Sequence, residues 1–182
     1  ATDPLVASTA AVFVDANLET AVRTALGKTA GALSISEVAA LEELVARGQG
    51  IGDLTGLEQA ASLVFLDLAD NEIDNLMPLA ALSALQVLVL DANAIVDLAP
   101  LAGLAALEVL AVEYNRIADL APLSALKSLE TLLLLGNRVE NLASLLALSA
   151  DGALKRVDLR ENPLGSAGFS DALADLRAAG VE

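Results

Sequence analysis

Leucine residues recur along the chain in a pattern that repeats every 22 residues. Aligned on these leucines, segments beginning at residues 63, 85, 107 and 129 read LVFLDLADNEI, LQVLVLDANAI, LEVLAVEYNRI and LETLLLLGNRV. An LxxL segment follows each of them, such as VDLAPLAGLAA after residue 95. A degenerate copy begins at Leu41, and a late copy, LKRVDLRENPL, begins at Leu154 after an insertion within SADGA, residues 149–153. This period predicts a stack of similar structural units.

Within each copy, leucines alternate with other residues, which predicts a short strand. Alternate side chains of a strand point to opposite faces, so we expect the leucines to face a core and the intervening residues to face solvent. One strand per copy predicts a parallel sheet with an outer face. The residues expected on that face are Phe65, Asp67, Val87, Val89, Asp91, Val109, Ala111, Glu113, Tyr114, Thr131, Leu133, Leu135, Arg156, Asp158 and Arg160, together with Ala69. The first row, Glu43, Val45 and Arg47, is expected to be partly covered by the N-terminal end.

One asparagine occupies the same place after the strand in five copies. These residues are Asn71, Asn93, Asn115, Asn137 and Asn162. An unpaired buried amide costs about 1–3 kcal/mol, so we expect each side chain to bond backbone groups in a ladder through the stack. The repeat itself explains these residues, which disfavours a catalytic or metal-binding role. The first copy has Gln49 here, which predicts a looser turn.

A second polar column follows the asparagines and consists of Asp53, Asn75, Asp97, Asp119 and Asn141. It precedes a proline in the middle copies. Aspartate and asparagine cap helical turns, and proline is favoured in the first turn. These residues therefore predict a short helical or 3₁₀ turn on the opposite side of each coil from the strand.

The two ends of the chain carry helix signals. Asp15 or Asn17 can cap a helix that ends at Gly27, and Ser34 with Glu37 has the spacing of a capping box. The segment SDALADLRAAG predicts a helix that stops at Gly180. A repeat stack exposes its apolar core unless both ends are covered. We therefore expect a tail or linker over 1–14, a helical N-terminal cap over 15–40, repeats over 41–164 and a C-terminal cap over 165–182.

Composition narrows the classes of function. Hydrophobic residues make up 55% of the 182 residues but aromatic residues only 2%, which favours thin, regular layers of leucine and alanine. The net charge of −15 disfavours nucleic acid and anionic membranes as partners. Without cysteine or histidine, thiolate chemistry, disulfides, zinc fingers and imidazole triads are excluded. The longest uncharged run, residues 75–90, contains Pro78 and is too short for membrane insertion.

Two short motifs could suggest ligand chemistry. GKT at 27–29 lacks the earlier glycine of a phosphate loop and is better explained as a helix end. DLADNEIDN from residue 67 is acidic but lacks the glycine and the final glutamate of a calcium loop. We therefore expect no cofactor and no defined metal site, with weak cation binding by surface carboxylates left open. No nucleophile has a recognisable base, so the chain is expected not to be an enzyme.

The pattern LxxLxLxxNxI/L over 41–164 resembles that of leucine-rich repeats. The 22-residue period with DLxPLxxLxxL after the strand is similar to the bacterial internalin type, and both flanks resemble the caps of such proteins. The resemblance implies an α/β solenoid, a curved right-handed superhelix whose parallel sheet lines the concave side. The sequence departs from this pattern in three ways. Gln49 stands at the asparagine position of the first copy, Gly56 and Ser144 stand where the middle copies have proline, and the last copy begins late, at Leu154.

The expected outer face of the sheet has an apolar centre and a charged rim, which is typical of a protein-binding surface. We expect it to bind a protein ligand or a second copy of the chain. The alternative is a rigid scaffold or spacer, in which these aliphatic residues merely satisfy β propensity. The resemblance implies an extracellular or cell-surface location, with the cytoplasm as the alternative. Aromatic anchors are few, because only Phe65 and Tyr114 are expected on this face.

Overall fold

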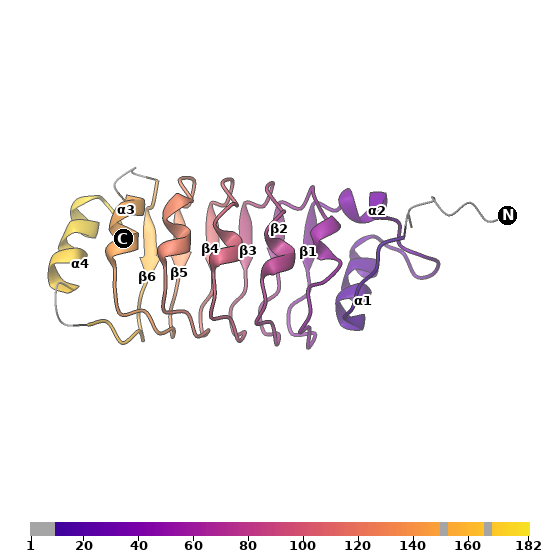
Figure 1. The fold of residues 1–182 in the computed structure, drawn as a ribbon, viewed down its shortest axis with the longest axis horizontal. Helices are drawn as coiled ribbons and strands as arrows, with labels where there is room; N and C mark the ends of the chain where they lie inside the picture. Colours follow the sequence, from indigo (N-terminus) through magenta and orange to yellow (C-terminus); the bar gives the residue numbers. More distant parts are fainter. Residues whose placement is uncertain (1–9, 150–152, 166–168) are drawn as a thin grey trace.

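The computed structural model describes residues 10–149, 153–165 and 169–182 of the chain. The molecule is an elongated row of coils with a helical cap at each end (Figure 1). The N-terminal cap contains α1 (Ala16–Ala25) and α2 (Ile35–Ala39), and the other end carries α4 (Phe169–Ala178).

Six short strands form one open parallel sheet in the order of the chain. They are β1 (Glu43–Val45), β2 (Phe65–Asp67), β3 (Val87–Val89), β4 (Val109–Ala111), β5 (Thr131–Leu133) and β6 (Arg156–Asp158). Their central residues pair with one another, as Leu66 with Leu88 and Leu88 with Leu110. The predicted leucine-rich-repeat solenoid, with one strand per copy, is confirmed.

The opposite side of each coil carries a short helical turn. These turns are η1 (Leu57–Gln59), η2 (Met77–Leu79), η3 (Ala99–Leu101), η4 (Ala121–Ala125) and the longer α3 (Ala143–Ser149). The predicted side-chain caps are not formed at the N-caps of η1 to η4, which make no side-chain bond. The predicted residues precede the N-caps and bond the backbone there: each of Asp53, Asn75, Asp97, Asp119 and Asn141 accepts a bond of 2.7–3.0 Å from the N–H two residues later. Where Ser144 replaces proline, an α-helix forms instead of a 3₁₀ turn.

The core lies between the sheet and the helical turns and consists mainly of leucine. The central strand residues Leu66, Leu88, Leu110 and Leu132 have no exposed surface. Removing a buried leucine side chain costs about 2–5 kcal/mol, and a one-residue slip would move a whole strand's leucines to solvent. The register of the strands is therefore set by the leucines.

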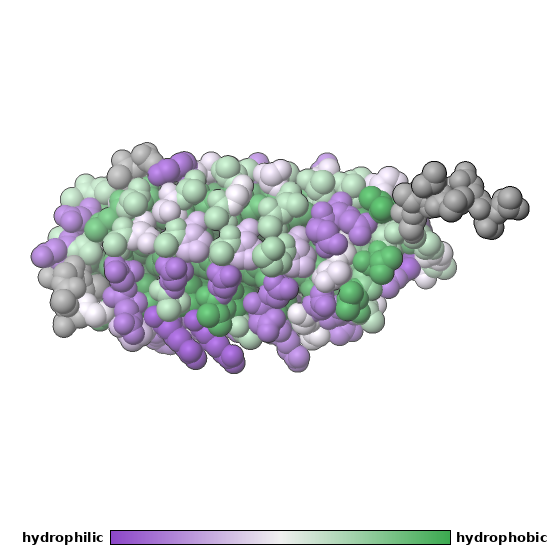
Figure 2. Space-filling view, viewed as in Figure 1, coloured by the Kyte–Doolittle hydropathy of each residue, from purple (hydrophilic) through white to green (hydrophobic). Residues whose placement is uncertain are grey.

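The helical turns face the viewer in Figures 1 and 2. Weakly apolar residues spread over this face, and polar residues gather along the lower edge, where the strands end (Figure 2). The exposed charged residues that follow the strands along the chain include Glu72, Asp74, Arg116, Arg138 and Glu140. The asparagine turns therefore combine a buried amide with a charged outer surface.

The N-terminal cap is built as its sequence predicts from Asp15 onward. Asp15 caps α1, and Ser34 and Glu37 form the capping box of α2. The expected tail differs, because residues 10–14 lie against this cap. Ala10 forms a β-bridge with Ser34, and Phe13 packs against the core. Residues 1–9 of the expected tail lie outside the described residues.

At the other end, α4 packs against α3 rather than against the sheet. Gly180, with a φ of 83°, lies just beyond the helix, as the sequence predicts. Val181 and Glu182 then return alongside β6, where the Glu182 N–H donates to the Lys155 carbonyl at 2.8 Å. Part of the expected insertion, residues 150–152, lies outside the described residues.

Candidate functional site: the outer face of the sheet

The first and third residue of each strand, and the residue two positions after the strand, project from the outer side of the sheet. We call this surface the sheet face. Register places Phe65 beside Val87 and Val87 beside Val109, and it places Val89 beside Ala111 and Ala111 beside Leu133. With strands about 4.8 Å apart, six of them span about 24 Å. Its centre is apolar over three neighbouring strands.

Most apolar side chains of the sheet face are half-buried. They are Phe65, Val87, Val89, Val109, Leu133 and Leu135, and Thr131 is half-buried as well. Ala111 differs from expectation because only 4% of it is exposed, between the longer Val89 and Leu133. Ala69, also expected at the surface, is fully buried. The apolar centre is therefore a shallow, close-packed surface.

The five asparagines lie in one column behind the turn that follows each strand. The Asn115 Nδ2 donates to the carbonyls of Leu90 and Val112 at 3.0 and 3.1 Å, and its Oδ1 accepts from the Ile95 N–H at 2.9 Å. Leu90 and Ile95 belong to the preceding coil, so the amide joins two coils through the backbone. Asn71, Asn93, Asn137 and Asn162 bond in the same way.

The first coil departs from this arrangement. Gln49 is exposed, and its backbone N–H instead donates to the Asn71 Oδ1 at 3.1 Å. Gly48 and Gly50, each with a φ of 66°, flank it. The ladder therefore begins at Asn71.

The residue before each ladder asparagine has a left-handed backbone, which the sequence analysis did not foresee. These residues are Asp70, Ala92, Tyr114, Gly136 and Glu161, with φ between 53° and 70°. A left-handed conformation costs a non-glycine residue about 1–2 kcal/mol. Tyr114 extends from this column over Gly136, where an added Cβ would lie 2.6 Å from the tyrosine Cδ1. Tyr114 is 53% exposed and borders the sheet face.

The sheet face begins with an uncovered first row. Val45 is 55% exposed, and Glu43 and Arg47 are exposed as well, so the expected partial cover by the cap is wrong. The Arg47 guanidinium lies 3.4 Å from the Asp67 carboxylate and 3.2 Å from that of Asp70. Arg47 belongs to this surface, as the sequence alternation predicts.

Two neighbouring carboxylates lie in the middle of the sheet face. Burial raises the pKa of Asp91, and the negative charges of Asp67 and Asp70 add to this effect. Burial also raises the pKa of Glu113, and Asp91 and Asp158 contribute further. The Glu113 N–H donates to the Asp91 Oδ1 at 2.8 Å, which opposes the rise at Asp91.

In the last row of the sheet face, the acidic residue Asp158 lies between the basic residues Arg156 and Arg160. Asp158 is bonded to the Arg160 guanidinium, which holds the pKa of the Asp158 carboxyl below its usual value. Arg156 is exposed beside it. The apolar centre is thus bordered by charged residues at both ends of the sheet.

The other candidate motifs are explained by local structure. Gly27 has a φ of 64° after α1, and the Lys28 Nζ lies 2.7 Å from the Glu37 carboxylate. Bonds from Lys28 and Ser34 lower the pKa of Glu37 to about 2. Over the described ranges, no group of three or more acidic side chains is arranged to hold a metal ion.

No family model and no curated protein matches the sequence. Solved structures do match. Internalin InlF from Listeria monocytogenes aligns with a TM-score of 0.73 and 24% identity over 92% of this chain and 55% of its own. Internalin C2 from the same organism aligns with a TM-score of 0.65 and 27% identity over 93% of this chain and 82% of its own. The chain therefore spans about half of the InlF structure and most of the internalin C2 structure.

A leucine-rich-repeat protein from Leptospira interrogans aligns with a TM-score of 0.71 and 26% identity, over 81% of this chain and 38% of its own. The resemblance to bacterial internalin-like leucine-rich-repeat proteins is therefore confirmed. Folds of this class are protein-interaction modules in general. None of the helices in the described residues is both long and apolar enough to cross a membrane.

Proposed function

We propose that the protein is a non-enzymatic interaction module that binds a protein ligand through the sheet face, at or outside the bacterial cell surface. The apolar centre around Val89, Val109 and Leu133 carries the proposal, because it is bordered by charged residues as protein-binding surfaces are. The likeness to internalins supports the location.

The physical advantage of this surface is rigidity. Each strand is fixed by leucines beneath it and by an asparagine that joins its coil to the preceding one. Half-buried aliphatic side chains lose little further freedom when a partner covers them, so the entropic cost of ordering the surface is small. Few aromatic anchors are present, which favours a broad contact over one deep pocket.

The proposal is tested with the double variant Val89→Asp/Leu133→Asp. Wild-type protein, the double variant and Ala102→Asp are immobilised and exposed to surface extracts of the source bacterium and of its host. Ala102 is exposed beside η3 on the other side of the coil, so it serves as the matched control. We expect a protein that binds wild type and Ala102→Asp and is reduced about tenfold or more on the double variant, because buried unpaired carboxylates are costly.

Equal capture by wild type and the double variant, with circular dichroism showing that all three proteins are folded, would reject the sheet face as the binding surface. Sedimentation of the wild-type protein separates a foreign ligand from self-association, because a dimer lost in the double variant identifies a second copy as the partner.

The second candidate function is a rigid scaffold or spacer. The half-burial of the aliphatic side chains favours it, because such residues can be inert members of the sheet. A chain that remains monomeric and captures nothing from either extract would support this function over ligand binding.

A further inference from the structure

Two carboxylates in the middle of the sheet face lack an ionic partner. Asp91 and Glu113 form no ion pair with any residue that the structure describes. One oxygen of Asp91 accepts the Glu113 N–H at 2.8 Å, and the Glu113 carboxylate has no hydrogen bond with a described residue. Both side chains can therefore accept hydrogen bonds from a molecule that covers this surface.

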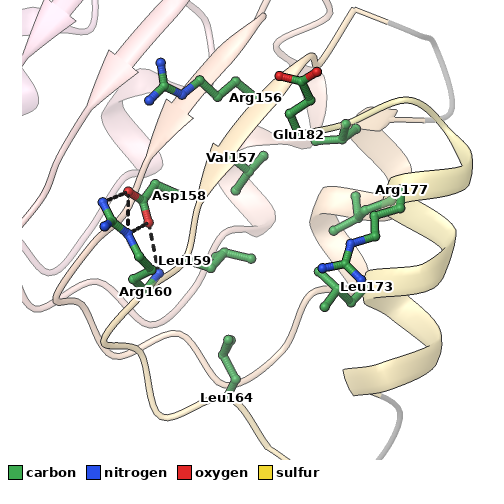
Figure 3. A pocket seen from close by; sticks show the side chains of 11 residues that line it. Arg156, Val157, Asp158, Leu159, Arg160, Leu164, Leu173, Arg177 and Glu182 are labelled. Atoms are coloured by element: carbon green, nitrogen blue, oxygen red, sulfur yellow. Dashed lines mark hydrogen bonds and ion pairs between the residues drawn. The ribbon is translucent and has the colours of Figure 1, made fainter.

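Two arginines of the same face are bonded to other carboxylates. The Arg47 guanidinium lies 3.4 Å from the Asp67 carboxylate and 3.2 Å from that of Asp70. Toward the other end of the sheet, Arg160 is bonded to Asp158 (Figure 3). The chain thus pairs a carboxylate at each end of the sheet face and leaves the two in the middle unpaired.

Apolar residues border these two central carboxylates. Val89 and Ala111 precede them along the chain by two residues, and the equivalent places in the flanking coils hold Ala69 and Leu135. Burial is the largest of the effects that raise the pKa of each carboxyl. A charge in such a place interacts more strongly with an opposite charge than it would in open water, because the effective dielectric constant is lower.

Tyr114 adds an aromatic ring beside the carboxylates. It follows Glu113 directly, and its ring lies over Gly136, where an added Cβ would lie 2.6 Å from the tyrosine Cδ1. The side chain is 53% exposed and so is open to a partner. Because the face of an aromatic ring attracts the charged groups of lysine and arginine, the ring and the carboxylates favour the same kind of side chain.

We propose that the protein ligand of the sheet face has an apolar contact surface carrying a lysine or arginine that pairs with Asp91 and Glu113. This inference rests on the proposed function and adds the chemistry of the partner. The aliphatic stem of the basic side chain packs on the apolar centre, and its charged end bonds the carboxylates. The net charge of −15 attracts a basic partner before contact and makes a second copy of the chain a poorer occupant.

The probe for this inference is a peptide selected for the sheet face. A phage-displayed library of random linear peptides is selected on immobilised wild-type protein in the presence of excess soluble Val89→Asp/Leu133→Asp. The soluble competitor removes peptides that bind elsewhere on the molecule. It also removes peptides that recognise negative charge alone, because it carries two additional carboxylates. We expect the remaining peptides to combine apolar residues with a lysine or arginine.

Fluorescence anisotropy of the synthesised peptides measures their affinity. Asp91→Asn/Glu113→Gln removes both charges at nearly constant size and is expected to weaken binding about tenfold or more. The matched control is Glu72→Gln/Asp74→Asn, which removes two exposed carboxylates outside the sheet face and should change the affinity less than about twofold. Replacing the basic residue of the peptide by glutamine should cost about tenfold on wild type and little on Asp91→Asn/Glu113→Gln.

Some peptides lost on Val89→Asp/Leu133→Asp could lack a basic residue or bind folded Asp91→Asn/Glu113→Gln as tightly as wild type. Peptides of that kind would overturn this inference and leave the proposed function standing. Equal weakening by the two charge-removing double variants would also overturn it, because general charge attraction would then explain the binding. If no selected peptide discriminates against Val89→Asp/Leu133→Asp, both proposals fail. Circular dichroism checks folding, and the single variants Asp91→Asn and Glu113→Gln decide the matter should the double variant unfold.

Discussion

Single asparagines join the coils of this molecule. Each side-chain amide bonds its own turn and the backbone of the preceding coil at the same time, as Asn115 does with Val112 and Leu90. Backbone groups next to the asparagine also join coils, as the Arg116 N–H does by donating to the Ile95 carbonyl at 2.9 Å. The asparagine is thus a side-chain cross-link between units that also meet through leucine packing and backbone hydrogen bonds.

Replacing Asn115 by alanine should lower the free energy of unfolding by about 2–4 kcal/mol. The loss arises because the Ile95 N–H and the Leu90 carbonyl are left without a partner. Asn115 is only 7% exposed, so these groups lie in a buried place. Urea unfolding followed by circular dichroism measures it. The control is Asn75→Ala, which removes one exposed bond from the Met77 N–H and should cost about 1 kcal/mol. Equal losses in the two variants would contradict a structural role for the buried amide beyond that of an exposed turn bond.

At the scale of elements, the sheet was predictable and some of its surroundings were not. The leucine spacing alone assigns Leu88 and Leu132 to the core and Val89 and Leu133 to the outer face, and the burial of these residues confirms it. The polar column before the helical turns was predicted to cap them, but its side chains bond the N–H two residues later and precede the N-cap residues.

The left-handed column was not predictable from sequence. Its members are aspartate, alanine, tyrosine, glycine and glutamate, so no shared side chain marks the position. The backbone shape is imposed by the neighbouring asparagine and by stacking of the coils, which outweigh the preference of each residue. The burial of Ala111 was missed for a related reason, since it depends on the length of Val89 and Leu133 on either side.

Asp91 and Glu113, two neighbouring carboxylates of the sheet face, make the stability of the fold depend on pH. The folded-state pKa of Asp91 is raised by burial, so its charged form destabilises the fold at pH 7, and this cost disappears as the pH falls through the raised pKa. Asp91→Asn keeps an oxygen that can accept from the Glu113 N–H and removes the charge. We expect a higher melting temperature than wild type at pH 7, with the difference shrinking as the pH falls toward about 4.

Thermal unfolding at several pH values measures this effect. Glu108→Gln, which removes one exposed carboxylate away from the sheet-face centre, controls for the change in net charge. A constant difference between Asp91→Asn and wild type from pH 7 to about pH 4 would show that the carboxylate is not the cause.

At the scale of the whole molecule, the described coils pack on the coils next to them, so stability is a sum of local terms along the row. Asp15 connects the N-terminal cap to the first coil through hydrogen bonds. Its carboxylate accepts from the N–H groups of Asn17 and Leu18 at the start of α1, and from those of Gly52 and Asp53 in the first coil.

Burial acts to raise the pKa of Asp15, but these four backbone bonds outweigh it and hold the pKa below its ordinary value. The stabilisation is therefore present above the unfolded-state pKa and is lost as the pH falls through the folded-state pKa. Asp15→Ala should remove the same four bonds, including the two to the first coil, at neutral pH.

We expect Asp15→Ala to speed hydrogen exchange in β1 and η1 strongly and in β4 and β5 little, because the cap no longer holds the first coil and the effect decays from neighbour to neighbour. Mass spectrometry of peptides after timed exchange measures it. Asp97→Ala, which removes a similar bond to Ala99 inside the row, is the matched control and should alter only η3. Uniformly faster exchange along the row in Asp15→Ala would instead mean that the solenoid opens as one cooperative unit.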